Sequence, residues 1–226
     1  MGFTRKIKYY LVHHLNYSNK AAQQSLENKV VEVDGCTVDY NCLIDNVSEI
    51  KVNGEVKRKK RELVYLKFNK PAGFESTLNK HVESTLADFF SEYTDLSIAG
   101  RLDKQSQGLL LLSNDGQWVE QLCNPKFEKE KKYLVELDKD VDGVFLRAFE
   151  AGVQLGNYLT KPCQCSRIEE QWIQVVLTEG KNRQIRRMCK ILGRQVVSLK
   201  RIGIATIQLD HLEEGRFERI DPESLQ

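Results

Sequence analysis

The chain has 226 residues, of which 41% are hydrophobic and 29% are charged, and its formal net charge is +2. This composition is ordinary for a globular protein with one large domain, or with a large and a small one. The longest leucine run, Leu109–Leu112, is far shorter than the roughly 18 apolar residues of a membrane span. Since the N-terminal segment also lacks an export signal, we expect a cytoplasmic protein that does not bind membranes.

Residues 1–56 predict a small unit of two helices followed by short strands. Apolar residues at helical spacing indicate an amphipathic helix over about residues 5–15, and Ser18 can cap a second helix that ends near Asn28. The next segments alternate with a period of two around one Asp-Gly and one Asn-Gly pair, which favours two hairpins. The basic run at residues 57–61, KRKKR, predicts the linker that ends this unit.

Residues 62–226 predict a larger unit in which strands and helices are mixed without regular alternation. Strand patterns occur within 63–73, 96–100, 109–112, 131–137, 172–180 and twice within 195–209. Helix patterns occur within 84–90, 141–152 and 184–192, and a short helix that holds Trp118 and Leu122 is expected after the leucine run. The four leucines are apolar on both faces, so their strand is expected at the centre of a sheet. No glycine-rich dinucleotide or phosphate-loop pattern is present, and the order of elements favours an α+β fold over a doubly wound one.

A charged pair stands directly before the central strand, in the segment GRLDKQSQGLLLL. Asp103 is expected on a loop beside buried backbone, where an unpaired carboxylate costs several kcal/mol, and an arginine is its natural partner. Structural ion pairs of this kind are common. The pattern by itself therefore leaves a structural and a catalytic role open.

Basic residues gather in one part of this near-neutral chain. Residues 181–201 contain eight Lys or Arg residues and no Asp or Glu. On a helical wheel the basic side chains share one face and the apolar ones the other, with Arg186 at the edge of the basic face. A solvated helix face is the plain alternative, but the absence of acidic partners favours a surface that binds a phosphate backbone.

Four segments together carry a family resemblance: FNKPAGFEST, GRLDKQSQG, EKKYLVEL and LTEGKNRQIRRMCKILG. In this order and at this spacing they resemble the motifs of RNA pseudouridine synthases of the RsuA/RluF family, with details closest to the large-subunit synthase F branch. The first unit resembles the S4-type RNA-binding domain that such enzymes carry. The resemblance implies a catalytic fold built on a mixed, largely antiparallel sheet over residues 62–226.

The resemblance also implies roles for individual residues. Asp103 matches the essential aspartate, Tyr133 the active-site tyrosine, and Arg186 the basic residue that pairs with the aspartate. Arg101 is expected beside the flipped nucleotide, and Ile185 against the uracil. Further RNA contacts are expected from Arg183, Arg187, Lys190, Lys6, Lys20, Lys57, Arg58, Lys59, Lys60 and Arg61. The arginine pair usual at the start of the second S4 helix is absent, since Ser18-Asn19-Lys20 stand there instead.

The implied reaction converts a specific uridine to pseudouridine in structured RNA. It needs neither a redox step nor a group donor, so no cofactor is expected, and no cysteine pair has the Cys-x-x-Cys spacing of a zinc site. The branch resemblance favours 23S ribosomal RNA as substrate, while a 16S uridine or a tRNA stem-loop stays open, and we expect a monomer. Two other classes of protein are the alternatives: a non-catalytic RNA-binding or ribosome-assembly factor, and a hydrolase that uses Asp103 with Asp115.

Overall fold

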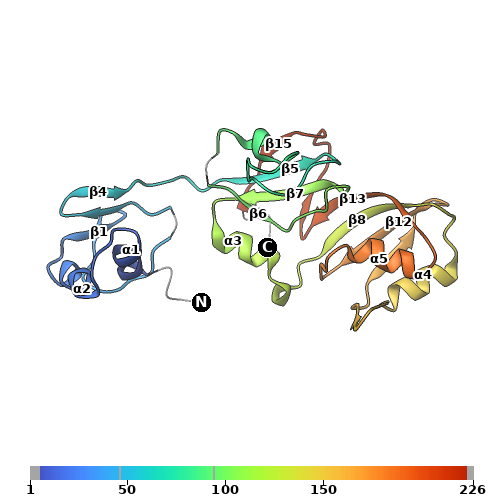
Figure 1. Cartoon of the computed structure of the whole chain (residues 1–226), viewed down its shortest axis with the longest axis horizontal. Coiled ribbons are helices and arrows are strands. Elements are labelled where there is room, and N and C mark those ends of the chain that lie inside the picture. The colour runs from blue at the N-terminus through green and yellow to red at the C-terminus, as the bar shows by residue number, and fades with distance from the viewer. Residues whose placement is uncertain (1–5, 46, 94, 223–226) are drawn as a thin grey trace. The chain divides into compact units, whose positions relative to one another are not determined.

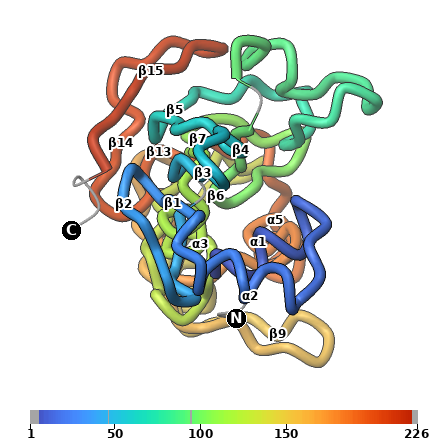
Figure 2. Tube along the Cα trace, turned by 90° about the vertical axis from the view of Figure 1, so that its left-hand side faces the viewer, coloured from blue at the N-terminus to red at the C-terminus, as the bar shows by residue number. Residues whose placement is uncertain are grey.

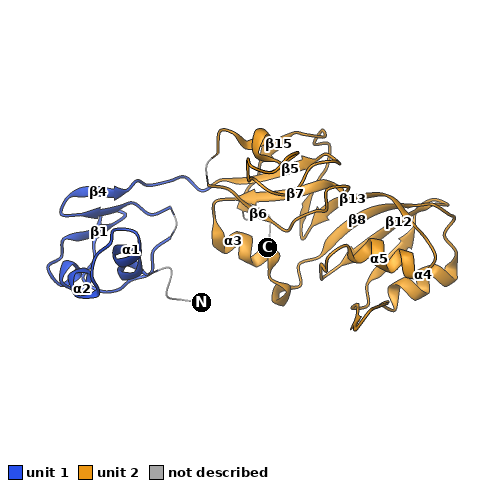
Figure 3. Ribbon diagram, in the orientation of Figure 1, with its two compact units in different colours: residues 1–63 blue, residues 64–226 orange. Residues whose placement is uncertain are grey.

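The chain divides into two compact units, residues 1–63 and 64–226 (Figure 3). The structure, a computed structural model, describes residues 6–45, 47–93 and 95–222. Within these ranges no helix combines the length and the apolar character that crossing a membrane requires.

In the part of the first unit that the structure describes, two helices accompany a four-stranded sheet with the strand order β2-β1-β3-β4 (Figure 1). The elements are α1 (Ile7–His13), α2 (Asn19–Glu27), β1 (Val31–Val33), β2 (Cys36–Thr37), β3 (Ile50–Val52) and β4 (Glu55–Arg58). As predicted, the Ser18 side chain caps α2 by accepting a hydrogen bond from the backbone N–H of Ala21. Both predicted hairpins form, and their Asp-Gly and Asn-Gly pairs have the positive φ angles that such tight turns require.

The basic run 57–61 differs from the predicted linker, because it belongs to the first unit. Lys57 and Arg58 continue β4. The Arg58 guanidinium lies 4.9 Å from the centre of the Tyr10 ring and donates a hydrogen bond to the Ser48 carbonyl. The backbone N–H of Arg61 also bonds to this unit, at the carbonyl of Val47. These contacts hold the run against the small sheet, and the unit ends at residue 63.

The second unit is built on one mixed sheet, flanked by helices. Among the described residues, nine strands join it: β5 (Tyr65–Lys70), β6 (Ser97–Ala99), β7 (Gln107–Ser113), β8 (Lys131–Leu137), β11 (Gln164–Arg167), β12 (Trp172–Leu177), β13 (Val196–Ile204), β14 (Ile207–Gln208) and β15 (Phe217–Arg219). The main order is β11-β12-β8-β13-β7-β5-β15, and β6 and β14 pair with β7 and β13. Every pairing is antiparallel except that between β7 and β13, so the fold is the predicted α+β class.

The four-leucine strand β7 is central, as the sequence predicts. Leu110 and Leu112 enter the main core, whereas Leu109 and Leu111 enter a smaller core on the opposite face. The helix α3 (Gly116–Cys123) covers that smaller core with Trp118. The helices α4 (Gly143–Glu150) and α5 (Gln184–Ile191) contribute to the main core, beside β8 and β12 (Figure 1).

The remaining differences concern short elements. The helix expected at residues 84–90 is a 3-10 turn over Ala87–Phe90, and a second such turn covers Pro125–Phe127. Four strands carry too few alternating residues to be read from the sequence: β11, β15, and the two strands of the hairpin β9 (Gln154–Leu155) and β10 (Tyr158–Leu159). Strand β15, near the end of the chain, lies beside β5 at the edge of the sheet (Figure 2).

Candidate active site

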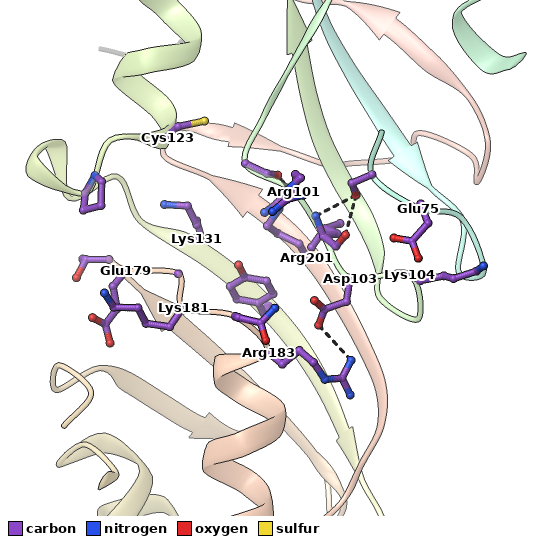
Figure 4. A pocket seen from close by; sticks show the side chains of 18 residues that line it. Glu75, Arg101, Asp103, Lys104, Cys123, Lys131, Glu179, Lys181, Arg183 and Arg201 are labelled. Atoms are coloured by element: carbon purple, nitrogen blue, oxygen red, sulfur yellow. Dashed lines mark hydrogen bonds and ion pairs between the residues drawn. The ribbon is translucent and has the colours of Figure 1, made fainter. Parts of the chain in front are cut away.

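Asp103 lies on the loop between β6 and β7 and faces a pocket of about 590 Å³. The pocket is formed mainly by the Asp103 loop, strand β8, and the turn between β12 and α5, and the segment after β5, the end of α3 and strand β13 complete its wall. Its lining includes six basic side chains, namely Arg101, Lys104, Lys131, Lys181, Arg183 and Arg201, and three acidic ones, Glu75, Asp103 and Glu179 (Figure 4). A hollow with this excess of positive charge attracts a phosphate-bearing ligand.

The partner of Asp103 is Arg183. Its Nη1 lies 3.6 Å from Oδ2 of Asp103, and Figure 4 shows the two side chains pointing toward each other. Arg183 is half exposed and the Asp103 side chain is 27% exposed, so solvent reaches both groups. An ion pair of this kind orients its members more than it stabilises the fold.

The prediction that Arg186 pairs with the aspartate is wrong in this structure. The Arg186 guanidinium donates instead to the carbonyls of Val196 and Gln105 at 3.2 Å each, and to the Ser106 hydroxyl at 3.4 Å. Arg186 sits one turn into α5, at the edge of the core, where burial lowers its pKa. It thus ties α5 to the backbone that follows Asp103, while Arg183, just before the helix, reaches the carboxylate.

Tyr133 lies in the pocket as predicted, whereas Ile185 does not. Strand β8 presents the Tyr133 ring to the pocket, and the residue is only 8% exposed. Ile185 is 4% exposed and packs in the main core beneath α5. An apolar residue one position after the start of this helix points to the sheet, which explains why Ile185 is not part of the pocket lining.

The Asp103 loop is held at both ends by a buried arginine that the sequence analysis did not select. Arg201 in β13 is 1% exposed, and its guanidinium donates to the carbonyl of Leu109 at 2.7 Å and to that of Gly100 at 2.8 Å. Gly108 lets β13 approach, because a Cβ there would lie 2.2 Å from the Arg201 carbonyl oxygen. The only signal in the sequence is a Lys-Arg pair within the strand segment VVSLKRIGI, and it does not distinguish the buried Arg201 from Lys200.

Two residues of the FNKPAGFEST segment fix the middle of the same loop. Lys70 is fully buried, and its Nζ donates to the carbonyls of Ser106 at 2.7 Å, Pro71 at 2.9 Å and Lys104 at 3.3 Å. Burial lowers the Lys70 pKa to about 8. The Ser76 hydroxyl bonds both to the N–H and to the carbonyl of Leu102. These contacts explain why a lysine ends the buried strand β5.

The other predicted RNA-binding residues are divided between the two units. Arg101 lines the pocket, and Arg187 and Lys190 lie exposed on α5. The remaining basic residues belong to the first unit: Lys6, Lys20, Lys57, Arg58, Lys59, Lys60 and Arg61. Asp115 caps α3 and accepts a hydrogen bond from the Tyr65 hydroxyl, so it does not join Asp103 as a second catalytic carboxylate.

Comparisons with known proteins define the class. Residues 64–190 match the family described as RNA pseudouridylate synthase. The dual-specificity RNA pseudouridine synthase RluF of Escherichia coli K12 is 31% identical over 92% of this chain and 72% of its own. The ribosomal small subunit pseudouridine synthase A of Yersinia pestis is 31% identical over 96% of this chain and 94% of its own.

A solved structure agrees with these relatives. A crystal structure of a pseudouridylate synthase superposes with a TM-score of 0.71 at 29% identity, and the match covers 98% of this chain and 99% of that one. The chain therefore belongs to the RNA pseudouridylate synthase family, whose members are isomerases that act on RNA.

Proposed function

We propose that this enzyme extrudes one uridine of structured ribosomal RNA into the Asp103 pocket and isomerises it there, with Asp103 as the essential group. One observation supports this most: Asp103, Arg183 and Tyr133 meet in a single basic pocket. A stacked uridine cannot reach this carboxylate. Base flipping costs a few kcal/mol, which stacking and hydrogen bonds in the pocket offset.

The reaction breaks the bond between N1 of uracil and C1′ of ribose, turns the base, and forms a bond between C5 and C1′. The C5 hydrogen leaves as a proton, and N1 gains one. Asp103 acts on the base or the ribose in its carboxylate form, and the Arg183 guanidinium keeps that carboxylate turned into the pocket. No bond in this sequence requires a cofactor.

Tyr133 and Arg101 are assigned to the flipped nucleotide. The Tyr133 ring provides a surface on which uracil stacks, a contact worth about 1–3 kcal/mol per base. Its hydroxyl is the candidate for moving the C5 proton. Arg101 lines the pocket directly before Leu102 and Asp103, where its guanidinium meets the RNA that the uridine leaves.

The substrate we propose is 23S ribosomal RNA, on the motif details shared with the RluF branch. The small-subunit synthase of Yersinia pestis makes a 16S uridine the alternative, with a tRNA stem-loop as the third. The first unit acts as an S4-like RNA-binding domain, and its basic residues bind phosphates without reading sequence. The two helices followed by a small sheet in that unit are consistent with this role.

The test uses RNA that carries tritium at C5 of its uridines. Since rejoining through C5 expels that hydrogen, the wild-type enzyme should release tritium into water. Asp103→Asn should release none while it binds the RNA with similar affinity and keeps the same thermal midpoint. Equal release by both proteins would overturn the assignment of Asp103, and no release by the wild type from any ribosomal RNA or tRNA would overturn the proposed function.

A further inference from the structure

The turn that carries Arg183 is held by a buried carboxylate, that of Glu179, to which the proposed function gives no role. Glu179 lies in the pocket wall, two residues after the end of β12, and is 7% exposed. We propose that Glu179 is a positioning residue, which acts through Gln184 to hold Arg183 against Asp103. This inference rests on the proposed function and adds to it the device that orients the catalytic ion pair.

Glu179 accepts hydrogen bonds from two different segments. Its Oε1 accepts from Gln184 Nε2 at 2.7 Å, and from the backbone N–H of Lys161 at 3.1 Å. Its Oε2 accepts from the hydroxyl of Tyr158 in the β9–β10 hairpin. These three donors occupy the carboxylate and fix it between the hairpin and the start of α5. It is therefore engaged in structure, although it faces the same pocket as Asp103.

Gln184 passes this constraint to the turn. Its backbone N–H donates to the Lys181 carbonyl at 3.1 Å, and its side-chain oxygen accepts from the Lys181 N–H at 3.0 Å. The turn from Lys181 to Gln184 is thus closed twice by one residue. Since Glu179 holds the other end of the Gln184 amide, that side chain is 4% exposed and has one orientation in which all these bonds form.

The clamp explains the backbone of Arg183. This residue has φ 50° and ψ 36°, a left-handed conformation that a non-glycine residue keeps only where its surroundings impose it. The twofold closure by Gln184 is what imposes it here. In this conformation the Arg183 side chain turns back toward the pocket, and its Nη1 reaches Asp103.

The experiment reverses the hydrogen bond between the two side chains. Gln184→Glu places a second carboxylate 2.7 Å from Glu179, where an amide donor stood, so the clamp should open. We expect kcat to fall about tenfold or more, since a displacement of about 1 Å near the reacting groups can cost a hundredfold, with a smaller change in KM. Glu179→Gln combined with Gln184→Glu restores a donor and an acceptor between these two side chains and loses only the bond from the Lys161 N–H, so it should recover part of the lost kcat.

A matched control comes from the neighbouring Glu128. Its carboxylate pairs with the Lys161 side chain at 2.6 Å on the surface, while Glu179 binds the backbone of the same residue. Glu128→Gln should leave kcat unchanged. If Gln184→Glu does not fold, as judged by its thermal midpoint, Gln184→Leu replaces it, since leucine removes the hydrogen bonds of the Gln184 side chain to Glu179 and Lys181 without adding a charge.

A second arm separates positioning from general damage. In an Arg183→Ala background the same change at Gln184 should cost little further kcat, because the group that it positions is already gone. An undiminished loss in that background, or wild-type kcat for the folded Gln184 variants, would overturn the inference. Neither result touches the proposed function, which fails only if the wild-type enzyme forms no pseudouridine or Asp103→Asn still forms it.

Discussion

Arg183 meets Asp103 across the pocket, with Nη1 of the arginine 3.6 Å from Oδ2 of the aspartate. The two residues come from segments far apart in the sequence, one before β7 and the other before α5. Neither residue is deeply buried, so the pair contributes about 0–1 kcal/mol to folding. Its value lies in the direction that it gives to the carboxylate.

Arg183→Ala should therefore reduce turnover without reducing stability. We expect a thermal midpoint close to that of the wild type and a clear fall in kcat, measured by tritium release from C5-labelled RNA. Arg183→Lys keeps the charge and should recover part of the activity. A kcat equal to that of the wild type in Arg183→Ala would show that the ion pair has no part in the reaction.

The buried Lys70 predicts how stability depends on pH. Its pKa of about 8 lies below the value of about 10.4 for an unfolded lysine, because burial disfavours the charged form. Between these two values the unfolded chain binds more protons than the folded one. The free energy of unfolding should therefore gain a contribution as pH rises from about 8 to 10, and Lys70→Met, measured by denaturant titration, should lack this gain.

Activity should respond to the same titration in the opposite sense. The Lys70 ammonium donates to three carbonyls, those of Lys104 and Ser106 in the Asp103 loop and that of Pro71. A neutral amine has only two N–H groups, so it cannot make all three bonds. We expect kcat to decline above about pH 8 in the wild type. In Lys70→Met this decline should disappear, although kcat is lower at every pH. A decline of the same shape in the variant would assign it to another group.

Gly108 should be intolerant of a side chain. An alanine Cβ would lie 2.2 Å from the Arg201 carbonyl oxygen, at a φ of +102° that alanine rarely adopts. We expect Gly108→Ala to lower the free energy of unfolding by about 3 kcal/mol or more, because β7 and β13 must separate. Gly156→Ala is the control: its φ is +69° with nothing within 4 Å, so it pays only about 1 kcal/mol of backbone strain. Equal losses would contradict the close approach of the two strands.

Removal of residues 1–63 should affect RNA capture more than folding. Residues 64–226 have their own two apolar cores, so the truncated protein should unfold cooperatively at a similar temperature. Its RNA affinity should fall, and the logarithm of its affinity should depend less steeply on salt, because basic residues of the first unit no longer displace counterions. Unchanged affinity and salt dependence would remove the RNA-binding role from the first unit.

Sequence patterns predicted the elements whose signals are local. The leucine run defined the centre of the sheet, the Asp-Gly and Asn-Gly pairs defined the hairpins, and Ser18 defined a helix start. The resemblance placed Asp103 and Tyr133, which the structure brings to one pocket. The composition of the basic run 57–61 predicts a linker, whereas the structure includes this run in the first unit. The contacts of Arg58 with Tyr10 and Ser48, which hold it there, are not visible in composition.

The arginine partner could not be chosen from the helical wheel. Arg183 lies outside the helix, in a left-handed conformation that no periodic pattern predicts, and it reaches the carboxylate that was expected to pair with Arg186. The roles of Lys70 and Arg201 are not predictable from the sequence for a related reason. Each acts on backbone carbonyls of a loop distant in sequence, and such contacts exist only after the sheet has formed.

The most direct test of the account is a map of pseudouridines in the ribosomal RNA and tRNA of cells that lack this gene. The map should lose at least one site, which returns when the wild-type gene is restored and stays absent when the Asp103→Asn gene is restored instead. The position of that site would identify the RNA. Identical maps with and without the gene, or a site restored by Asp103→Asn, would contradict the claim that this carboxylate makes pseudouridine.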